Sequence, residues 1–103
     1  MRYNNMEIKK EKNGGSLHIQ LFGRLDTVTA PQFEASLKED LDSLTELIID
    51  FQTLEYVSSA GLRVLLMAQK QMNKQGKMKI INVSEPIKEV FDMTGFSDIL
   101  TIE

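Results

Sequence analysis

A short apolar run, a polar turn and a long apolar run together constrain this chain more than any other feature. The first run, Leu47 to Phe51, is apolar on both faces, which is typical of a parallel strand buried under helices. The second run begins at Leu62 and has the length of a helix. Between the runs lie Ser58, Ser59 and Gly61. A strand that leads through a tight turn into a helix predicts an α/β domain.

The N-terminal part predicts a hairpin. Residues Met6 to Lys12 alternate weakly and suit an edge strand, because their charges discourage pairing with another chain. Asn13-Gly14-Gly15 favours a tight turn, which needs positive φ. The next strand places Leu17, Ile19 and Leu21 on one face.

Helices and strands alternate in the rest of the chain. Thr29-Ala30-Pro31-Gln32 resembles a helix start, with threonine as the cap and glutamine reaching back. A second helix is expected from Ser59 to about Gln75, capped by Gly76. The other expected features are an apolar stripe of Phe33, Leu37, Leu41 and Leu44, a strand from Met78 to Val83, a short helix from Ser84 to Gly95, and a final strand from Ile99 to Ile102.

Composition limits the possible functions. The 103 residues suit one domain, 1–103, and a net charge of −3 argues against nucleic acid as a partner. The chain has no cysteine, and its single histidine, His18, is expected on the surface with no catalytic role. No apolar run approaches the length of about 20 residues that spans a bilayer, and no signal peptide is recognisable, so we expect a cytoplasmic protein.

The two serines allow two interpretations. At the first turn of a helix, free backbone N–H groups and the helix dipole accommodate a phosphate. The alternative is that Ser58 and Ser59 only cap the helix and form the turn. Neither a Gly-x-Ser-x-Gly elbow nor a phosphate-binding loop is present. Asp26 and Asp50, both expected at strand ends, either flank the serines or cap turns.

The long helix also leaves two possibilities open. It carries too many apolar residues for one face of a surface helix to bury. Either the whole helix is sunk into the core, or the part near Val64, Met67 and Ala68 belongs to a partner interface.

Four segments together resemble the STAS domain family, and specifically the bacterial anti-sigma factor antagonists that consist of one small domain. They appear in the family's order and cover nearly the whole chain: Gly23-Arg24-Leu25-Asp26 with Thr29-Ala30, Ile48-Ile49-Asp50-Phe51, Tyr56-Val57-Ser58-Ser59-Ala60-Gly61-Leu62, and Phe91-Asp92-Met93-Thr94-Gly95-Phe96. The resemblance implies a STAS-type α/β domain with a mixed, mostly parallel sheet of about five strands, an N-terminal hairpin and packed helices.

The resemblance also implies a phosphorylation site. The family commonly has Asp-Ser-Ser/Thr-Gly-Leu at the turn, so Ser59 matches the phosphoacceptor and Ser58 replaces the aspartate. Ser58 is the second candidate acceptor. Ala60 replaces the second hydroxyl residue of the family pattern. Asp26 is expected beside Ser59, orienting its hydroxyl or contacting the partner, unless it only caps its turn. The expected partner-binding residues are Asp26, Thr27, Ser58, Ser59, Ala60, Gly61, Val64 and Met67.

The implied function is partner switching. In the family, the unmodified antagonist binds an anti-sigma factor that is also a serine kinase with a histidine-kinase-like ATPase fold, which frees the sigma factor. Phosphorylation releases the antagonist, and a PP2C-type phosphatase restores it. The chain itself is then not an enzyme and is expected to bind no cofactor and no metal.

Other readings remain. One is a cytoplasmic STAS subunit of a lipid-transport ATPase, and another is the same phosphoserine switch acting on a non-sigma target such as secretion or biofilm control. A small enzyme or nucleotide-binding protein would need a catalytic pair, and the sequence offers none.

Overall fold

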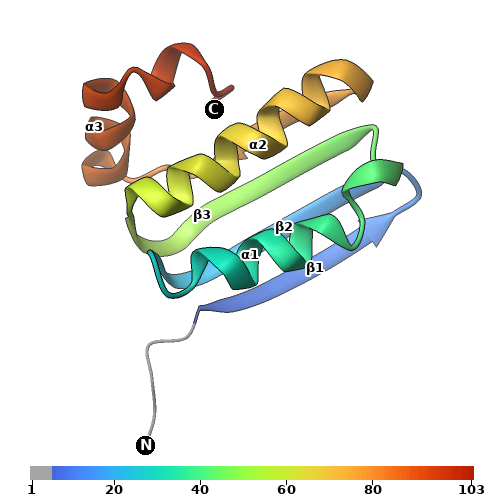
Figure 1. Ribbon diagram of the computed structural model, residues 1–103, viewed down its shortest axis with the longest axis horizontal. Helices are drawn as coiled ribbons and strands as arrows, with labels where there is room; N and C mark the ends of the chain where they lie inside the picture. Colours follow the sequence, from blue (N-terminus) through green and yellow to red (C-terminus); the bar gives the residue numbers. More distant parts are fainter. Residues whose placement is uncertain (1–5) are drawn as a thin grey trace, which may run out of the picture.

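The sheet has the predicted mixed topology. The computed structural model describes residues 6–103, and the four strands within this range form one sheet in the order β1-β2-β3-β4 (Figure 1). β1 (Glu7–Asn13) and β2 (Ser16–Leu25) form the antiparallel hairpin, and β3 (Glu46–Val57) and β4 (Lys77–Ile81) continue in parallel. The expected α/β fold class is therefore confirmed. Residues 1–5 of the expected domain range lie outside the described part.

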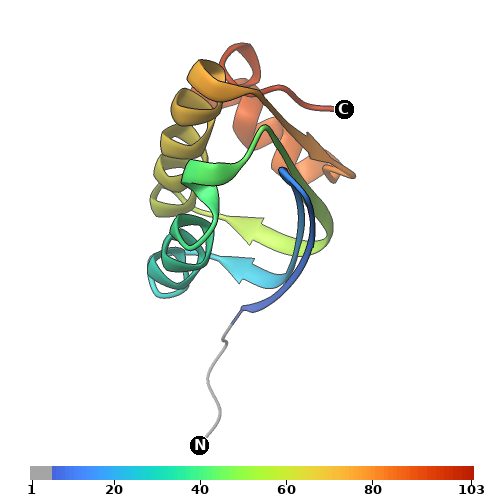
Figure 2. The same ribbon diagram turned by 90° about the vertical axis from the view of Figure 1, so that its right-hand side faces the viewer.

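Two helices, of which the second is the longest of the described chain, cover one face of this sheet. α1 (Ala30–Lys38) connects β2 to β3, and α2 (Ser59–Gln75) connects β3 to β4 (Figure 2). These are the crossover connections that parallel strands require. A third helix, α3 (Glu85–Thr94), follows β4, and two short 3₁₀ turns are η1 (Leu41–Ser43) and η2 (Phe96–Asp98). Among the described residues, no helix is long and apolar enough to cross a bilayer.

The core lies between the sheet and the helices. Alternate strand residues point toward α1 and α2 and are buried, as period-two alternation requires. Phe91 of α3 packs against Phe51 of β3 with ring centroids 6.3 Å apart. His18 projects from the opposite face and is partly exposed, as predicted. The buried strand residues are Leu17, Ile19, Leu21, Leu25, Leu47, Ile49, Phe51, Leu54, Val57, Met78 and Ile80.

Two strand boundaries differ from the prediction. β3 continues to Val57 instead of ending near Phe51, because its second half still pairs with the end of β2 after a shift in register. The expected strand from Ile99 to Ile102 is reduced to one parallel bridge between Ile80 and Ile102. The 3₁₀ turn η2 explains this difference, since Leu100 N–H still donates to Phe96 O at 2.8 Å and keeps the chain turning.

The helix ends also differ in detail. Thr29 is the N-cap of α1, but its Oγ1 donates to Arg24 O at 2.6 Å instead of capping the helix. Gln32 Nε2 donates to Met6 O at 2.7 Å instead of reaching back. Gly76 ends α2 with an extended backbone, and glycine is required there because a Cβ would overlap Thr45 O. The predicted apolar stripe extends beyond the end of α1. Its four residues are nevertheless all buried: Phe33, Leu37, Leu41 and Leu44.

Candidate functional site

The two serines lie where the ends of β2 and β3 meet the start of α2. Leu25 and Val57 are paired at the ends of the two strands. Ser58 N–H donates to Leu25 O at 2.9 Å, and Ser58 O accepts the first helical hydrogen bond from Leu62 N–H at 2.9 Å. Ser58 is the N-cap, with φ −103° and ψ 176°, and Ser59 is the first residue of α2. The predicted position at a helix start is therefore present.

The hydroxyls of the two serines have different surroundings. Ser58 Oγ is buried and has no hydrogen-bond partner among residues 6–103. Ser59 is exposed. The N-cap side chain makes no capping hydrogen bond, and the first turn of α2 contains no acidic residue. The positive end of the helix dipole is thus not balanced by a side chain of its own first turn.

Asp26 caps its own turn. Its Oδ1 accepts hydrogen bonds from Val28 N–H at 3.0 Å, Thr29 N–H at 3.1 Å and Thr29 Oγ1 at 3.2 Å, and its Oδ2 lies 3.6 Å from Arg24 Nε. The backbone hydrogen bond from Thr29, with those from Val28 N–H and the Thr29 hydroxyl and the Arg24 charge, lowers the pKa of Asp26. Every hydrogen bond of Asp26 in the described chain lies within this turn, which supports the capping alternative over the orientation of Ser59.

Asp50 lies far from the serines along β3. It was expected at a strand end, but the strand runs on for seven more residues to Val57. Its Oδ1 accepts Gln52 N–H at 2.8 Å and Asn82 Nδ2 at 3.0 Å, and its Oδ2 lies 3.8 Å from His18 Nε2. Eight residues of extended chain span about 25 Å. The suggestion that Asp50 flanks the serines is therefore wrong.

A shallow cleft of about 320 Å³ lies between α1 and α2. One of its lining residues, Ala60, directly follows Ser59 in the chain. Half of its lining comes from residues of the predicted partner-binding set. Its lining residues are Thr27, Ala30, Pro31, Glu34, Ala60, Arg63, Val64 and Met67. The structure thus brings four predicted residues together: Thr27, Ala60, Val64 and Met67.

α2 is buried along one side and only partly buried along the side that faces the cleft. Ala68 is completely buried, and Gly61 and Val64 are also buried, so these positions serve the core. Ala60 and Met67 are only partly buried. Any contact of Val64 with a partner is limited to the part of its side chain that lines the cleft.

Sequence reasoning missed two features of the surface. Arg24 places its guanidinium 4.2 Å from the ring centroid of Tyr56, which joins the ends of β2 and β3. Val28 and Met93 are large apolar side chains that remain 76% and 82% exposed. Val28 adjoins Thr27 of the cleft in sequence, and exposed apolar groups of this kind are common in interaction surfaces.

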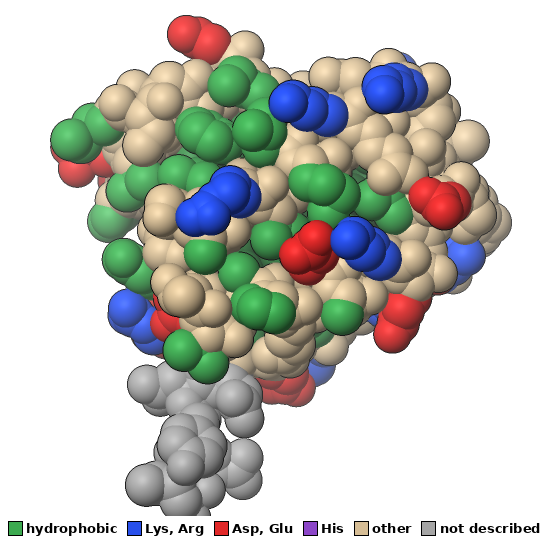
Figure 3. Space-filling model, viewed as in Figure 1, with side chains coloured by type: hydrophobic (Ala, Val, Ile, Leu, Met, Phe, Trp, Pro, Cys, Tyr) green, Lys and Arg blue, Asp and Glu red, His purple; other side chains and the backbone are tan. Residues whose placement is uncertain are grey.

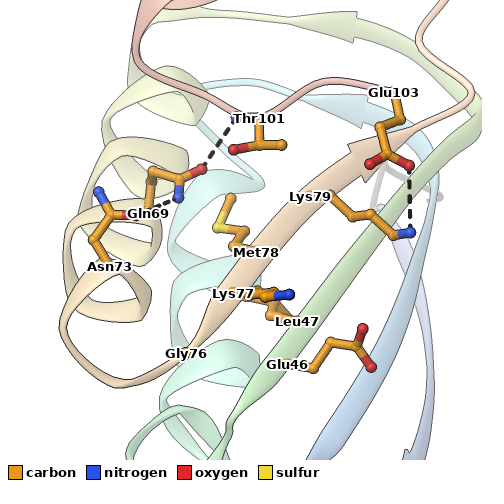
Figure 4. A pocket seen from close by; sticks show the side chains of 10 residues that line it. All are labelled: Glu46, Leu47, Gln69, Asn73, Gly76, Lys77, Met78, Lys79, Thr101 and Glu103. Carbon is orange, nitrogen blue, oxygen red and sulfur yellow. Dashed lines mark hydrogen bonds and ion pairs between the residues drawn. The ribbon is translucent and has the colours of Figure 1, made fainter.

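A second hollow lies at the outer edge of β4 (Figure 4). Gln69 Oε1 accepts Thr101 N–H at 3.3 Å there, and Gln69 Nε2 donates to Asn73 Oδ1 at 2.9 Å. None of the predicted site residues lines this hollow. Across residues 6–103, no group of three or more His, Cys, Asp and Glu side chains is arranged to hold a metal ion.

Comparisons with known proteins agree with this architecture. The STAS domain model matches residues 7–103. The chain is 33% identical to BtrV of Bordetella bronchiseptica over 99 residues, covering 94% of this chain and 85% of BtrV. It is 29% identical to the anti-sigma-B factor antagonist of Bacillus subtilis over 99 residues, covering 95% and 91%. The solved structure of unphosphorylated SpoIIAA, an anti-sigma factor antagonist, superposes with a TM-score of 0.81 at 22% identity, covering 94% of this chain and 88% of SpoIIAA. The chain therefore belongs to the STAS domain family.

Proposed function

We propose that this protein is an anti-sigma factor antagonist whose binding to its partner is switched off by phosphorylation of Ser59. The observation that carries the proposal is the placement of Ser59 as the exposed first residue of α2. The proposal is further supported by family membership and by the relatives that are named as antagonists of anti-sigma factors.

The buried Ser58 hydroxyl favours Ser59 as the acceptor. A kinase transfers the γ-phosphoryl group of ATP to a serine oxygen, which loses its proton, and ADP leaves. The acceptor oxygen must therefore reach the active site of the kinase. Ser59 is exposed, whereas Ser58 Oγ is buried and could react only after the turn opens.

A phosphate on Ser59 is compatible with the fold. It would sit at the N-terminus of α2, where the first-turn N–H groups and the dipole favour negative charge. No acidic side chain of that turn would repel it. We therefore expect the phosphorylated domain to remain folded, with the change confined to its surface.

The same phosphate would oppose a partner docked on this surface. It adds a charge of roughly −1.5 to −2, which must be desolvated in the interface. The cleft lined by Thr27, Ala60 and Met67, with the exposed Val28 beside it, supplies the apolar contact area. Losing about 3 kcal/mol of binding free energy weakens the affinity about 100-fold.

The partner is proposed to be a serine kinase that also binds the sigma factor. This kinase would supply the ATP site and its magnesium ion, and a PP2C-type phosphatase would remove the phosphate. The exchange would take place in the cytoplasm. Asp26 and Arg24, at the end of β2, are proposed to form the rim of the contact surface.

The first experiment maps the modified residue. The protein is incubated with each candidate kinase of the same genome and Mg-ATP, and the phosphorylated peptide is sequenced by mass spectrometry. Phosphate on Ser59, retained in Ser58→Ala and lost in Ser59→Ala, is expected. Modification of Ser58 in the wild-type protein, or of neither serine by any kinase, would contradict the proposal.

The second experiment distinguishes a loss of partner binding at the interface from a loss of the fold. Ser59→Ala and Ser59→Asp are compared for kinase affinity, and circular dichroism verifies that both are folded. Ser84→Asp is the control, because Ser84 is an exposed serine at the start of another helix, α3, and makes no side-chain capping bond there. Only Ser59→Asp is expected to bind weakly. Equal affinities for the two Ser59 variants would count against the switch.

A further inference from the structure

The outer face of α2 carries three cations and no acid. Arg63, Lys70 and Lys74 are exposed, and they are the only charged residues in this helix. The whole chain has a net charge of −3, so positive charge is concentrated here against the overall balance. Figure 3 shows blue side chains along α2 with green ones between them.

These cations form one stripe that begins at the serine. Arg63 and Lys70 are seven residues apart and Lys74 follows four later, which places them on one side of the helix. Ser59 precedes Arg63 by four residues and lies at the head of this side. Leu66 and Met67, both partly buried, share the shallow hollow that the three cations line. We call Arg63, Lys70 and Lys74, with Leu66 and Met67, the cationic stripe.

The charges of the cationic stripe are not neutralised within the domain. In the described part of the chain, Arg63, Lys70 and Lys74 form no ion pair within 4.0 Å. Two acids border the stripe but are engaged elsewhere. Glu34 lines the cleft with Arg63 yet pairs with Lys38 at 3.1 Å, and Asp42 accepts a hydrogen bond from Gln71 at 2.7 Å.

We infer that the cationic stripe is an electrostatic docking surface for an acidic face of the anti-sigma factor that contacts Ser59. The inference rests on the proposed function, because it adds a surface to the same complex. Charge complementarity gives the partner's chemistry, since three unpaired cations attract a surface rich in Asp and Glu. Leu66 and Met67 add apolar contact between the charges. The stripe is continuous with Ser59 along one helix, so one partner can cover both.

The inference gives phosphorylation a second effect. Side chains four residues apart on a helix are neighbours, so a phosphate on Ser59 lies within reach of Arg63. Its charge of roughly −1.5 to −2 offsets much of the stripe's positive charge. Phosphorylation then removes the attraction that speeds docking as well as obstructing the contact at Ser59.

The test reverses charge at the two stripe residues farthest from Ser59. Lys70→Glu/Lys74→Glu is compared with wild type for its association rate constant with the kinase that phosphorylates Ser59, at low and high salt. The control, Lys9→Glu/Lys77→Glu, changes the net charge equally at exposed lysines outside α2. The stripe variant is expected to associate about 10-fold or more slowly at low salt and to lose most of the salt dependence. The control is expected to associate at nearly the wild-type rate.

Two results would overturn the inference. One is an unchanged association rate for Lys70→Glu/Lys74→Glu while wild type still binds the kinase, which leaves the proposed function intact. The other is that wild type but not this variant sediments with phosphatidylglycerol vesicles while both bind the kinase equally, which assigns the stripe to a membrane surface. Failure of wild type to bind any kinase would instead refute the proposed function itself.

Discussion

Gly61 in the first turn of α2 faces Leu25 at the end of β2 so closely that a Cβ on Gly61 would lie 2.6 Å from Leu25 Cγ and 3.1 Å from Leu25 O. Leu25 O also accepts the N–H of Ser58 at 2.9 Å. Leu25 therefore fixes both the N-cap of α2 and the distance between the first turn of α2 and the sheet. The position of Ser59 at the surface depends on this contact.

Gly61→Ala is expected to destabilise the domain by about 1–3 kcal/mol, because overpacking forces the helix or Leu25 to move. The measurement is the free energy of unfolding in urea. Leu25→Ala alone is expected to cost about 2–5 kcal/mol by opening a cavity. The double variant should be less destabilised than the sum of the two, since the new methyl group then has space. Strict additivity would show that the two residues do not compete for the same volume.

Ser58→Ala is expected to leave stability unchanged or to raise it slightly. Replacing a serine N-cap by alanine normally costs about 0.5–2 kcal/mol because a capping hydrogen bond is lost. Ser58 makes no such bond, and its buried hydroxyl has no partner within the described residues. Urea unfolding of Ser58→Ala and wild type measures the difference. A loss of more than about 1 kcal/mol would mean that the hydroxyl caps α2 in solution.

The fold was largely predictable because its strong patterns are local. The apolar run from Leu47, the hairpin glycines and the long helix after Ser59 each specify an element without help from distant residues. The extent of β3 was not predictable, because its second half mixes polar residues with the buried Leu54 and Val57 and loses the period-two alternation where its register against β2 shifts. The predicted length of the final strand was too great for a related reason. Ile99 to Ile102 has strand composition, but the η2 turn delays pairing until Ile102.

The candidate site was predictable in position but not in detail. The strand–serine–helix order predicted that Ser59 starts a helix, as it does, yet only the structure separates the buried hydroxyl of Ser58 from the exposed Ser59. The role of Asp26 depended on the conformation of its turn, which the sequence left open. Gln69 did leave a signal, because its spacing from Leu65 and Met72 places a polar residue on the buried stripe of α2.

Gln69→Leu is expected to loosen the C-terminal segment. Gln69 is only 3% exposed, and its side chain ties Thr101 N–H to α2 (Figure 4). Losing this acceptor leaves Thr101 N–H without its partner and should cost about 1–3 kcal/mol. Hydrogen exchange at Glu103 N–H, which donates to Ile80 O at 2.9 Å, reports on the bridge directly. Asn73→Asp is the control, because it changes an exposed residue of the same hollow while keeping an oxygen acceptor for Gln69 Nε2 and the bond from Thr101 N–H to Gln69. Unchanged exchange in Gln69→Leu would contradict this role.

Asp26→Asn is expected to make the domain less sensitive to acid. The hydrogen bonds from Thr29 and Val28 lower the pKa of Asp26 in the folded state. An aspartate with a lowered folded pKa contributes stability that is fully present above its unfolded pKa of about 3.9 and is lost as the pH falls through the folded value. Asparagine keeps the acceptor oxygen but does not titrate. Part of the stability that wild type loses below about pH 5 should therefore be retained in Asp26→Asn.

The measurement is the urea midpoint as a function of pH for wild type and Asp26→Asn. Asp40 supplies a matched comparison, because a hydrogen bond from Lys10 and a further one from Lys12 lower its pKa as well. Asp40→Asn should reduce the acid slope in the same pH range while leaving Ser59 phosphorylation unaffected, since Asp40 lies beyond the far end of α1. If Asp26→Asn keeps the full wild-type acid slope, the turn does not stabilise the ionised carboxylate. If it also slows phosphorylation while the fold is intact, Asp26 contacts the kinase in addition to capping its turn.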